Sequence, residues 1–151
     1  MIKAFIATLA LSTLCIPQVE ASTSVFTEMD LLNHINDIGG RVYIDSQYCQ
    51  DNPVYGMQVG AQIHICAQAH GTDTDELRDT IRHEVWHLVQ TCNEGPLVPG
   101  PVRAIAEAYK RGWTGEGYAP DVYHMEAEAY NAAAILSAED IKEAVDNYCL
   151  E

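Results

Sequence analysis

His83, Glu84 and His87 form an HExxH motif, which constrains the local fold of this chain more strongly than any other feature of its sequence. On an α-helix, residues four apart lie on one face and about 6 Å apart along the axis, so both imidazoles can reach a single metal ion. Glu84 then points to the edge of that ion. The motif therefore predicts a helix through residues 83–87 that carries a metal-binding face.

The sequence around the motif has the pattern of one long amphipathic helix over residues 72–92. Its apolar residues recur at spacings of three and four, which predicts a buried stripe formed by Leu77, Ile81, Val85, Leu88 and Cys92. Polar residues at 72–74 can cap the start, and the segment 93–96 contains the glycine and proline that end it. The alternative is that the two histidines only border the core and that the glutamate is a solvated charge.

The residue types of the motif predict a zinc site that activates water. Neutral imidazoles suit Zn²⁺, and a third protein ligand leaves the fourth position for a water whose pKa falls from about 16 to near 7. A carboxylate beside that water can take its proton and later pass it to a leaving amine. His83 and His87 are therefore the predicted ligands of one zinc ion, and Glu84 is the predicted general base.

The N-terminus has the pattern of an export signal. A lysine supplies the positive start, residues 4–16 a short apolar run, and residues 19–21 a cleavage site with a small last residue. The apolar run is well short of the ~20 residues that cross a bilayer. The sequence therefore predicts a signal peptide at 1–21 and one domain at 22–151. We expect an exported protein, secreted or periplasmic, with no membrane span after cleavage near Ala21.

Cysteine content supports the predicted export. Removal of the signal leaves Cys49, Cys66, Cys92 and Cys149, which predict two disulfides with three connectivities open. We expect Cys49 to pair with Cys66, because they flank a turn-rich connection between two predicted strands. Cys92 is expected to tie the end of the motif helix to Cys149 in the C-terminal helix. Free or metal-binding cysteines are the alternative, although the sequence contains no CxxC pair.

The formal net charge is −14 with and without the predicted signal, which carries one lysine and one glutamate. A chain this acidic repels nucleic acid and anionic membranes, and its sequence has no basic patch. We therefore expect no nucleic-acid partner. Acidity in general favours solubility, so the charge of any substrate stays open, and so does the oligomeric state.

The rest of the sequence predicts a single mixed domain with one core. Beside the motif helix, strands are expected at 41–46 and 61–67 and helices at 27–38, 102–111, 121–136 and from 137 onward. The fold class is therefore α+β, with a small sheet before the motif helix. The other histidines lack metal-ligand spacing and are expected at the surface or at strand edges: His34, His64 and His70.

The helix at 121–136 contains Glu126-Ala127-Glu128-Ala129-Tyr130, which has the form ExxA. Together with the HExxH helix, residues 81–136 resemble the gluzincin branch of the zincin metallopeptidases, in which a glutamate of this kind is the third zinc ligand. The resemblance implies a minimal zincin-like domain, a small β-sheet followed by an HExxH helix and a glutamate-bearing helix. It also implies Glu126 as the third ligand. The metzincin pattern fails, because this chain has Gln90 and Asn93 where glycine and histidine are required.

Two other residues of the same helix compete for the place of third ligand. Glu128 and His124 each lie about 200° from Glu126 in helical projection, so neither can share the metal with it on a regular helix. Glu128 is equally well explained as a solvated charge. Tyr130 stands where the family often has an Asp or Asn that hydrogen-bonds a zinc-binding histidine. We expect that support to come from Tyr130 itself or from Asn131.

Motif and resemblance together predict an exported zinc-dependent peptidase that hydrolyses peptide bonds in a peptide or protein substrate. The strand at 61–67 is expected to be the sheet edge along which an extended substrate pairs. Two alternatives stay open: a non-catalytic zincin-like module that holds zinc and binds a partner protein, and a zinc amidase acting on cell-wall peptides. Candidates for stabilising the oxyanion, with none preferred, are Tyr109, Tyr118, Tyr123 and His124.

Overall fold

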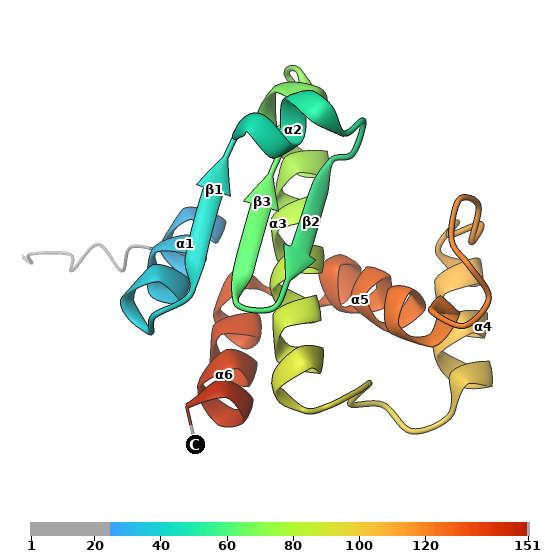
Figure 1. The fold of residues 1–151 in the computed structure, drawn as a ribbon. Coiled ribbons are helices and arrows are strands. Elements are labelled where there is room, and N and C mark those ends of the chain that lie inside the picture. The colour runs from blue at the N-terminus through green and yellow to red at the C-terminus, as the bar shows by residue number, and fades with distance from the viewer. Residues whose placement is uncertain (1–24, 151) are drawn as a thin grey trace, which may run out of the picture.

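The computed structural model describes residues 25–150, and the predicted signal peptide at 1–21 lies outside them. The described chain is a mixed α+β fold with six α-helices, one short 3-10 helix and a three-stranded sheet (Figure 1). The helices are α1 (Glu28–Asp37), α2 (Gln47–Asp51), η1 (Ala67–His70), α3 (Thr74–Cys92), α4 (Pro101–Lys110), α5 (Tyr123–Ile135) and α6 (Ala138–Cys149). The strands are β1 (Arg41–Ile44), β2 (Gly56–Val59) and β3 (Gln62–Ile65).

The sheet has the order β1-β3-β2, with β1 parallel and β2 antiparallel to β3. The expectation that strand 61–67 forms a sheet edge is therefore wrong, because β3 is the central strand and β2 is an edge. β2 lies within the stretch that the sequence indicated only as turn-rich. Its four residues begin with glycine and lack a clean apolar alternation, so only pairing with β3 makes them a strand.

α3 lies at the centre of the molecule, and its predicted apolar stripe faces the core. Ile81, Val85 and Leu88 are buried, whereas Leu77 and Cys92 are partly buried and pack against the same core. The core also includes Leu31, Leu32 and Ile35 of α1, Ile63 and Ile65 of β3, and Ile141 and Val145 of α6. α3 contacts the sheet, α5 and α6, so residues on its different faces meet three separate parts of the fold (Figure 1).

Helix ends follow the capping residues that the sequence supplies. Thr27 and Ser137 each form a capping box, at the start of α1 and of α6, in which the side chain accepts from the residue three positions on. Asp73 caps α3, which ends at Cys92 as predicted. These local signals fix where α1, α3 and α6 begin, and hence the face that each presents to the core.

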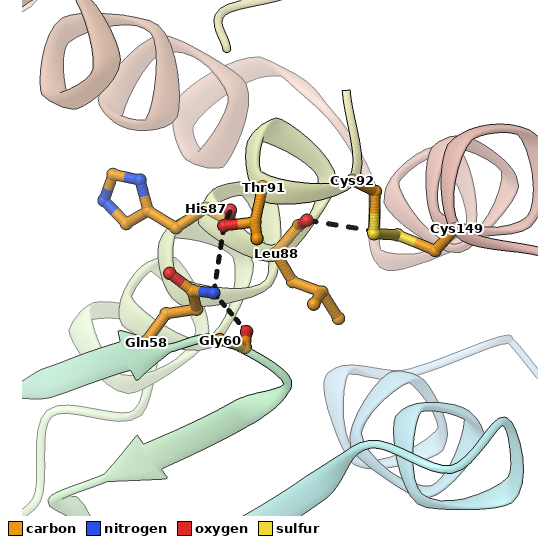
Figure 2. Close-up of a disulfide and its surroundings, with 7 residues drawn as sticks. All are labelled: Gln58, Gly60, His87, Leu88, Thr91, Cys92 and Cys149. Carbon is orange, nitrogen blue, oxygen red and sulfur yellow. Dashed lines mark hydrogen bonds between the residues drawn. A yellow bond between two sulfur atoms is a disulfide. The ribbon is translucent and has the colours of Figure 1, made fainter. Parts of the chain in front are cut away.

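Both predicted disulfides are confirmed, and the alternative of free or metal-binding cysteines is wrong for these four residues. Cys49 joins Cys66 with a Cα–Cα distance of 5.4 Å, and Cys92 joins Cys149 at 5.2 Å. Figure 2 shows the second bond tying the end of α3 to α6, with the imidazole of His87 pointing away from it. Disulfides of this kind fit an extracellular protein. Among the described helices, none is long and apolar enough to cross a membrane.

The three histidines expected at the surface or at strand edges do not gather into one site. Nε2 of His34 lies 2.6 Å from Oδ1 of Asp146, and the ring of His64 stacks on the ring of Tyr43. His70 is buried at 6 % exposure, so the expectation of a surface or edge position is wrong for it. Its ring packs against Tyr55, a tertiary contact across the chain that local spacing does not reveal.

Candidate metal centre and cleft

Three side chains from two helices converge on one point. Nε2 of His83 and Nε2 of His87 lie 3.0 Å apart on α3. Oε2 of Glu126, on the neighbouring helix α5, lies 3.3 Å from the first nitrogen and 3.5 Å from the second. Within residues 25–150 this is the one group of three His, Cys, Asp or Glu side chains arranged to hold a metal ion. The structure therefore brings together the three residues that the sequence predicted as ligands.

The triangle of atoms has the size of a metal-binding face. Bonds of about 2.0–2.1 Å at tetrahedral angles place two zinc ligands about 3.3 Å apart. The three separations of 3.0, 3.3 and 3.5 Å straddle that value. Two imidazole nitrogens and one carboxylate oxygen are also a donor set that zinc takes in hydrolytic sites, with one position left open. The residues present thus fit a zinc ion.

Oε2 of Glu126 is buried and satisfies no hydrogen-bond geometry with any described residue, although both histidine nitrogens are near it. Burial raises the pKa of the Glu126 carboxyl, but the close approach of His83 and His87 outweighs burial and lowers it to about 2. The oxygen is therefore an ionised acceptor without a well-aligned donor. A buried polar atom left in this state usually has a ligand or water as its partner.

Gln90 orients one of the two imidazoles. Its amide nitrogen donates to the backbone oxygen of Met125 at 3.0 Å, which turns its Oε1 toward Nδ1 of His87 at 2.7 Å. An amide oxygen only accepts, so Nδ1 carries a hydrogen, and in the neutral imidazole the lone pair is on Nε2, the atom that lies 3.5 Å from Oε2 of Glu126. Gln90 is completely buried, which fixes this arrangement.

The expectation that Tyr130 or Asn131 supports a histidine is wrong. The Tyr130 hydroxyl donates to the backbone oxygen of Arg111, and the Asn131 amide donates to that of Ala104. Both side chains hold α5 against α4 and do not reach the imidazoles. Gln90 supports the histidine instead. The sequence contained a signal for this role, because Gln90 lies three positions after His87 and hence on the same side of α3.

Glu128 is not the solvated charge that the sequence suggested. It is 3 % exposed, and its Oε1 accepts from the Trp86 indole at 3.1 Å and from the Leu97 amide at 3.0 Å. These bonds hold the loop that follows α3. His124, the other competing residue, has its Nε2 3.0 Å from the backbone oxygen of Val98. Both lie apart from the histidine pair, in keeping with the helical projection.

Glu84 lies beside the three ligand candidates and against the edge strand. It is 8 % exposed, and burial raises the pKa of its carboxyl, partly opposed by His83 and His87. A Cβ atom on Gly56 of β2 would stand 2.7 Å from Cγ of Glu84, so only glycine permits this approach of strand and helix. Gly56 was not among the predicted site residues, because nothing local in the sequence links residue 56 to residue 84.

β2 is held alongside α3 by side-chain contacts beyond Gly56. Gln58 donates to the Thr91 hydroxyl at 3.1 Å and also to the backbone oxygen of Gly60 (Figure 2). Gly56 meets α3 at Glu84 and Gln58 meets it at Thr91, so strand and helix run in the same direction. The unpaired side of the strand therefore follows the ligand-bearing face.

An open cleft of about 820 Å³ contains the site. Residues 54–58 of the β2 region form one wall, and the loop between α4 and α5 contributes residues 113–116 together with Tyr118. Of the four oxyanion candidates, only Tyr118 lines the cleft. Burial, together with the nearby charges of Glu126 and Glu84, raises the pKa of Tyr118 to about 12. Its phenol is thus a protonated donor close to the candidate ligands.

Comparison of the chain with protein-family models, with curated proteins and with solved structures gives no match.

Proposed function

We propose that this protein is an exported zinc-dependent peptidase with a zincin-like catalytic core, in which His83, His87 and Glu126 hold the metal and Glu84 is the general base. The observation that carries the proposal is the triangle of ligand atoms, 3.0 to 3.5 Å apart, beside a buried carboxylate in an open cleft. A purely structural HExxH sequence would need neither a buried Glu84 nor a cleft large enough for a peptide.

A zinc ion bound by these residues would supply an activated water and polarise a substrate carbonyl. The remaining chemistry belongs to the chain. The Glu84 carboxylate takes the proton of the attacking water and passes it to the leaving amine nitrogen. Gln90 holds His87 in the tautomer that leaves Nε2 free. The Tyr118 hydroxyl is a donor for the negative charge that develops on the carbonyl oxygen.

β2 supports an extended mode of substrate binding. Within the described sheet its one partner is β3, so its other edge offers unpaired backbone groups beside the cleft. A peptide that adds to this edge as a further strand lies next to Glu84, because Gly56 brings the strand backbone against that carboxylate. Backbone pairing of this kind fixes the direction of a peptide without selecting its sequence.

Metal analysis and hydrolysis assays test the proposal. The purified protein should hold about one zinc ion per chain and cleave casein or members of a broad peptide library. Glu84→Gln should abolish hydrolysis and keep zinc content and fold nearly intact, because Glu84 is a base and not a ligand. His83→Ala and His87→Ala should instead lose the metal.

The same assays separate the alternatives. A protein that holds one zinc but cleaves nothing in broad libraries would be a metal-stabilised binding module. Cleavage of cell-wall peptides without cleavage of ordinary peptides would make it an amidase, because zinc and Glu84 do not determine the acyl group. Near-normal turnover of Glu84→Gln would contradict the mechanism, and stoichiometric zinc in both histidine variants would contradict the site.

A further inference from the structure

The ligand-bearing face of α3 continues beyond His83 toward the start of the helix. Thr80, Asp79 and Glu76 precede His83 by three, four and seven residues, the spacings that keep side chains on one helical face. All three line the same cleft as the candidate ligands. At 1.5 Å of rise per residue, Glu76 lies about 10 Å from His83 along the axis. These three residues therefore line an arm of the cleft that runs from the candidate metal ligands to Glu76.

Among the described residues, Glu76 is paired with a histidine and with no lysine or arginine. Its Oε2 lies 3.3 Å from Nδ1 of His70, and in residues 25–150 no lysine or arginine forms an ion pair with it. Asp79 differs, because it pairs with Arg82. The Glu76 side chain is 47 % exposed, so its carboxylate is open to the cleft. Glu76 is thus the carboxylate of this arm that no lysine or arginine balances.

An aromatic ring contacts the same histidine as that carboxylate. Tyr55 lines the cleft and stacks on the His70 ring, with centroids 4.6 Å apart. His70 thus contacts Tyr55 and Glu76 at once, and its buried Nε2 has no partner among the described residues. One imidazole thus contacts both the ring and the carboxylate, while its own Nε2 stays unsatisfied. An exposed ring next to a carboxylate is suited to an ammonium or guanidinium group.

Apart from the candidate metal ligands, the rest of the cleft lining has no basic side chain. Its lining includes Glu116 on the far wall and no lysine or arginine. Glu116 makes no ion pair within the described part of the chain. The chain as a whole has a formal net charge of −14, which adds long-range attraction for cations. An acidic peptide would be repelled by Glu76 and by Glu116.

We propose that the cleft selects peptides with a lysine or arginine side chain, bound by Glu76 and Tyr55. The inference rests on the proposed peptidase function and adds a substrate class to it. An extended peptide advances about 3.3 Å per residue, so the 10 Å between the metal centre and Glu76 corresponds to about three residues. The basic side chain therefore lies two to four residues from the bond that is cut.

Fluorogenic peptides test this class of substrate. One position, two to four residues on either side of the cleaved bond, is varied among lysine, norleucine and glutamate, and kcat/KM is measured at about 20 mM and about 500 mM salt. At the best position and low salt we expect a preference of about tenfold for lysine over glutamate, falling at high salt because the charges are screened. Equal kcat/KM for the three peptides at every position would overturn the proposal.

Variants then locate the preference. Glu76→Gln should reduce the ratio of lysine to glutamate peptides to within about twofold. Asp75→Asn removes the same charge one residue away, at a side chain that does not line the cleft, and should keep the ratio. Tyr55→Phe should keep the lysine preference, and Tyr55→Ala should weaken it. An equal loss in Asp75→Asn and Glu76→Gln would mean that only net charge matters, and would overturn the subsite.

A binding measurement separates this proposal from the proposed function. The same peptides, labelled with a fluorophore, are titrated with the Glu84→Gln variant and followed by anisotropy. Preferential binding of lysine peptides that is lost when Glu76→Gln is added to this variant, together with no hydrolysis of any peptide by the parent protein, would support the subsite and contradict the peptidase function. Hydrolysis by the parent protein without any charge preference would support the peptidase function and contradict the subsite.

Discussion

Nδ1 of His87 lies 2.7 Å from Oε1 of Gln90, a buried amide that is itself held by the backbone of α5. This contact makes the tautomer of a candidate ligand depend on how two helices pack. Gln90→Leu should therefore weaken zinc binding by about 10- to 100-fold, because the imidazole loses its orienting acceptor. Zinc titration by competition with a chelator measures the effect. Asn131→Leu removes a comparable amide contact between α5 and α4 and should leave zinc affinity unchanged.

The two glutamates of α5 should behave differently. Glu126→Ala should lower zinc affinity by about 100-fold or more, because it removes a proposed ligand. Glu128→Ala should bind zinc like the parent but lose about 2–4 kcal/mol of unfolding free energy, because it leaves the Trp86 and backbone donors unpaired. Zinc titration and urea unfolding measure both effects. His124→Ala should keep the metal. Loss of zinc binding in Glu128→Ala, with normal binding in Glu126→Ala, would show that the ligand assignment is wrong.

Gly56→Ala should impair hydrolysis without removing the metal. The added methyl group would meet Glu84 at 2.7 Å, so either the carboxylate or β2 must move. We expect kcat to fall by about tenfold or more, since displacement of a catalytic group by about 1 Å can cost a hundredfold. Ile44→Ala, at an exposed residue on the far strand β1, is the matched control. Full activity in Gly56→Ala would mean that the position of Glu84 is not critical.

Tyr118→Phe removes a hydroxyl at the cleft wall and keeps the ring. If Tyr118 donates to the developing oxyanion, kcat should fall by about 10- to 100-fold, with zinc affinity unchanged. Steady-state kinetics on one peptide, with KM and kcat determined separately, checks this. Tyr109→Phe, outside the cleft, serves as the control. A rise in KM with unchanged kcat would instead indicate a role in substrate binding alone.

The disulfides should differ in what they contribute to stability. In the chain-entropy model, the Cys92–Cys149 bond, with its sequence separation of 57, constrains the unfolded chain more than the Cys49–Cys66 bond, with a separation of 17. The expected losses of unfolding free energy are about 4 and about 3 kcal/mol respectively. Paired Cys→Ala variants, unfolded in urea, measure them. A larger loss for the Cys49 and Cys66 pair would argue for native-state contacts around η1 as the main effect.

The sequence by itself determined the features that depend on local spacing. Helical periodicity placed the HExxH motif inside α3, capping residues fixed the starts of α1 and α6, and the cysteine positions predicted both disulfides. The separation of Glu126 from Glu128 also followed from the pitch of a helix. Apart from the Cys92–Cys149 bond, which joins residues 57 positions apart, each of these needs only neighbouring residues or a single turn-rich connection.

Tertiary structure alone decided which distant segments surround the motif. Gly56 meets Glu84 across 28 positions of sequence, and Tyr55 joins Glu76 through His70, because β2 packs beside α3. Burial of Glu128 likewise depends on the Trp86 indole and on the loop after α3. A strand of four residues carries little pattern of its own, and a buried charge is stable only where donors from elsewhere in the chain converge on it. Local periodicity does not encode this convergence of donors, because it depends on how distant segments of the chain pack together.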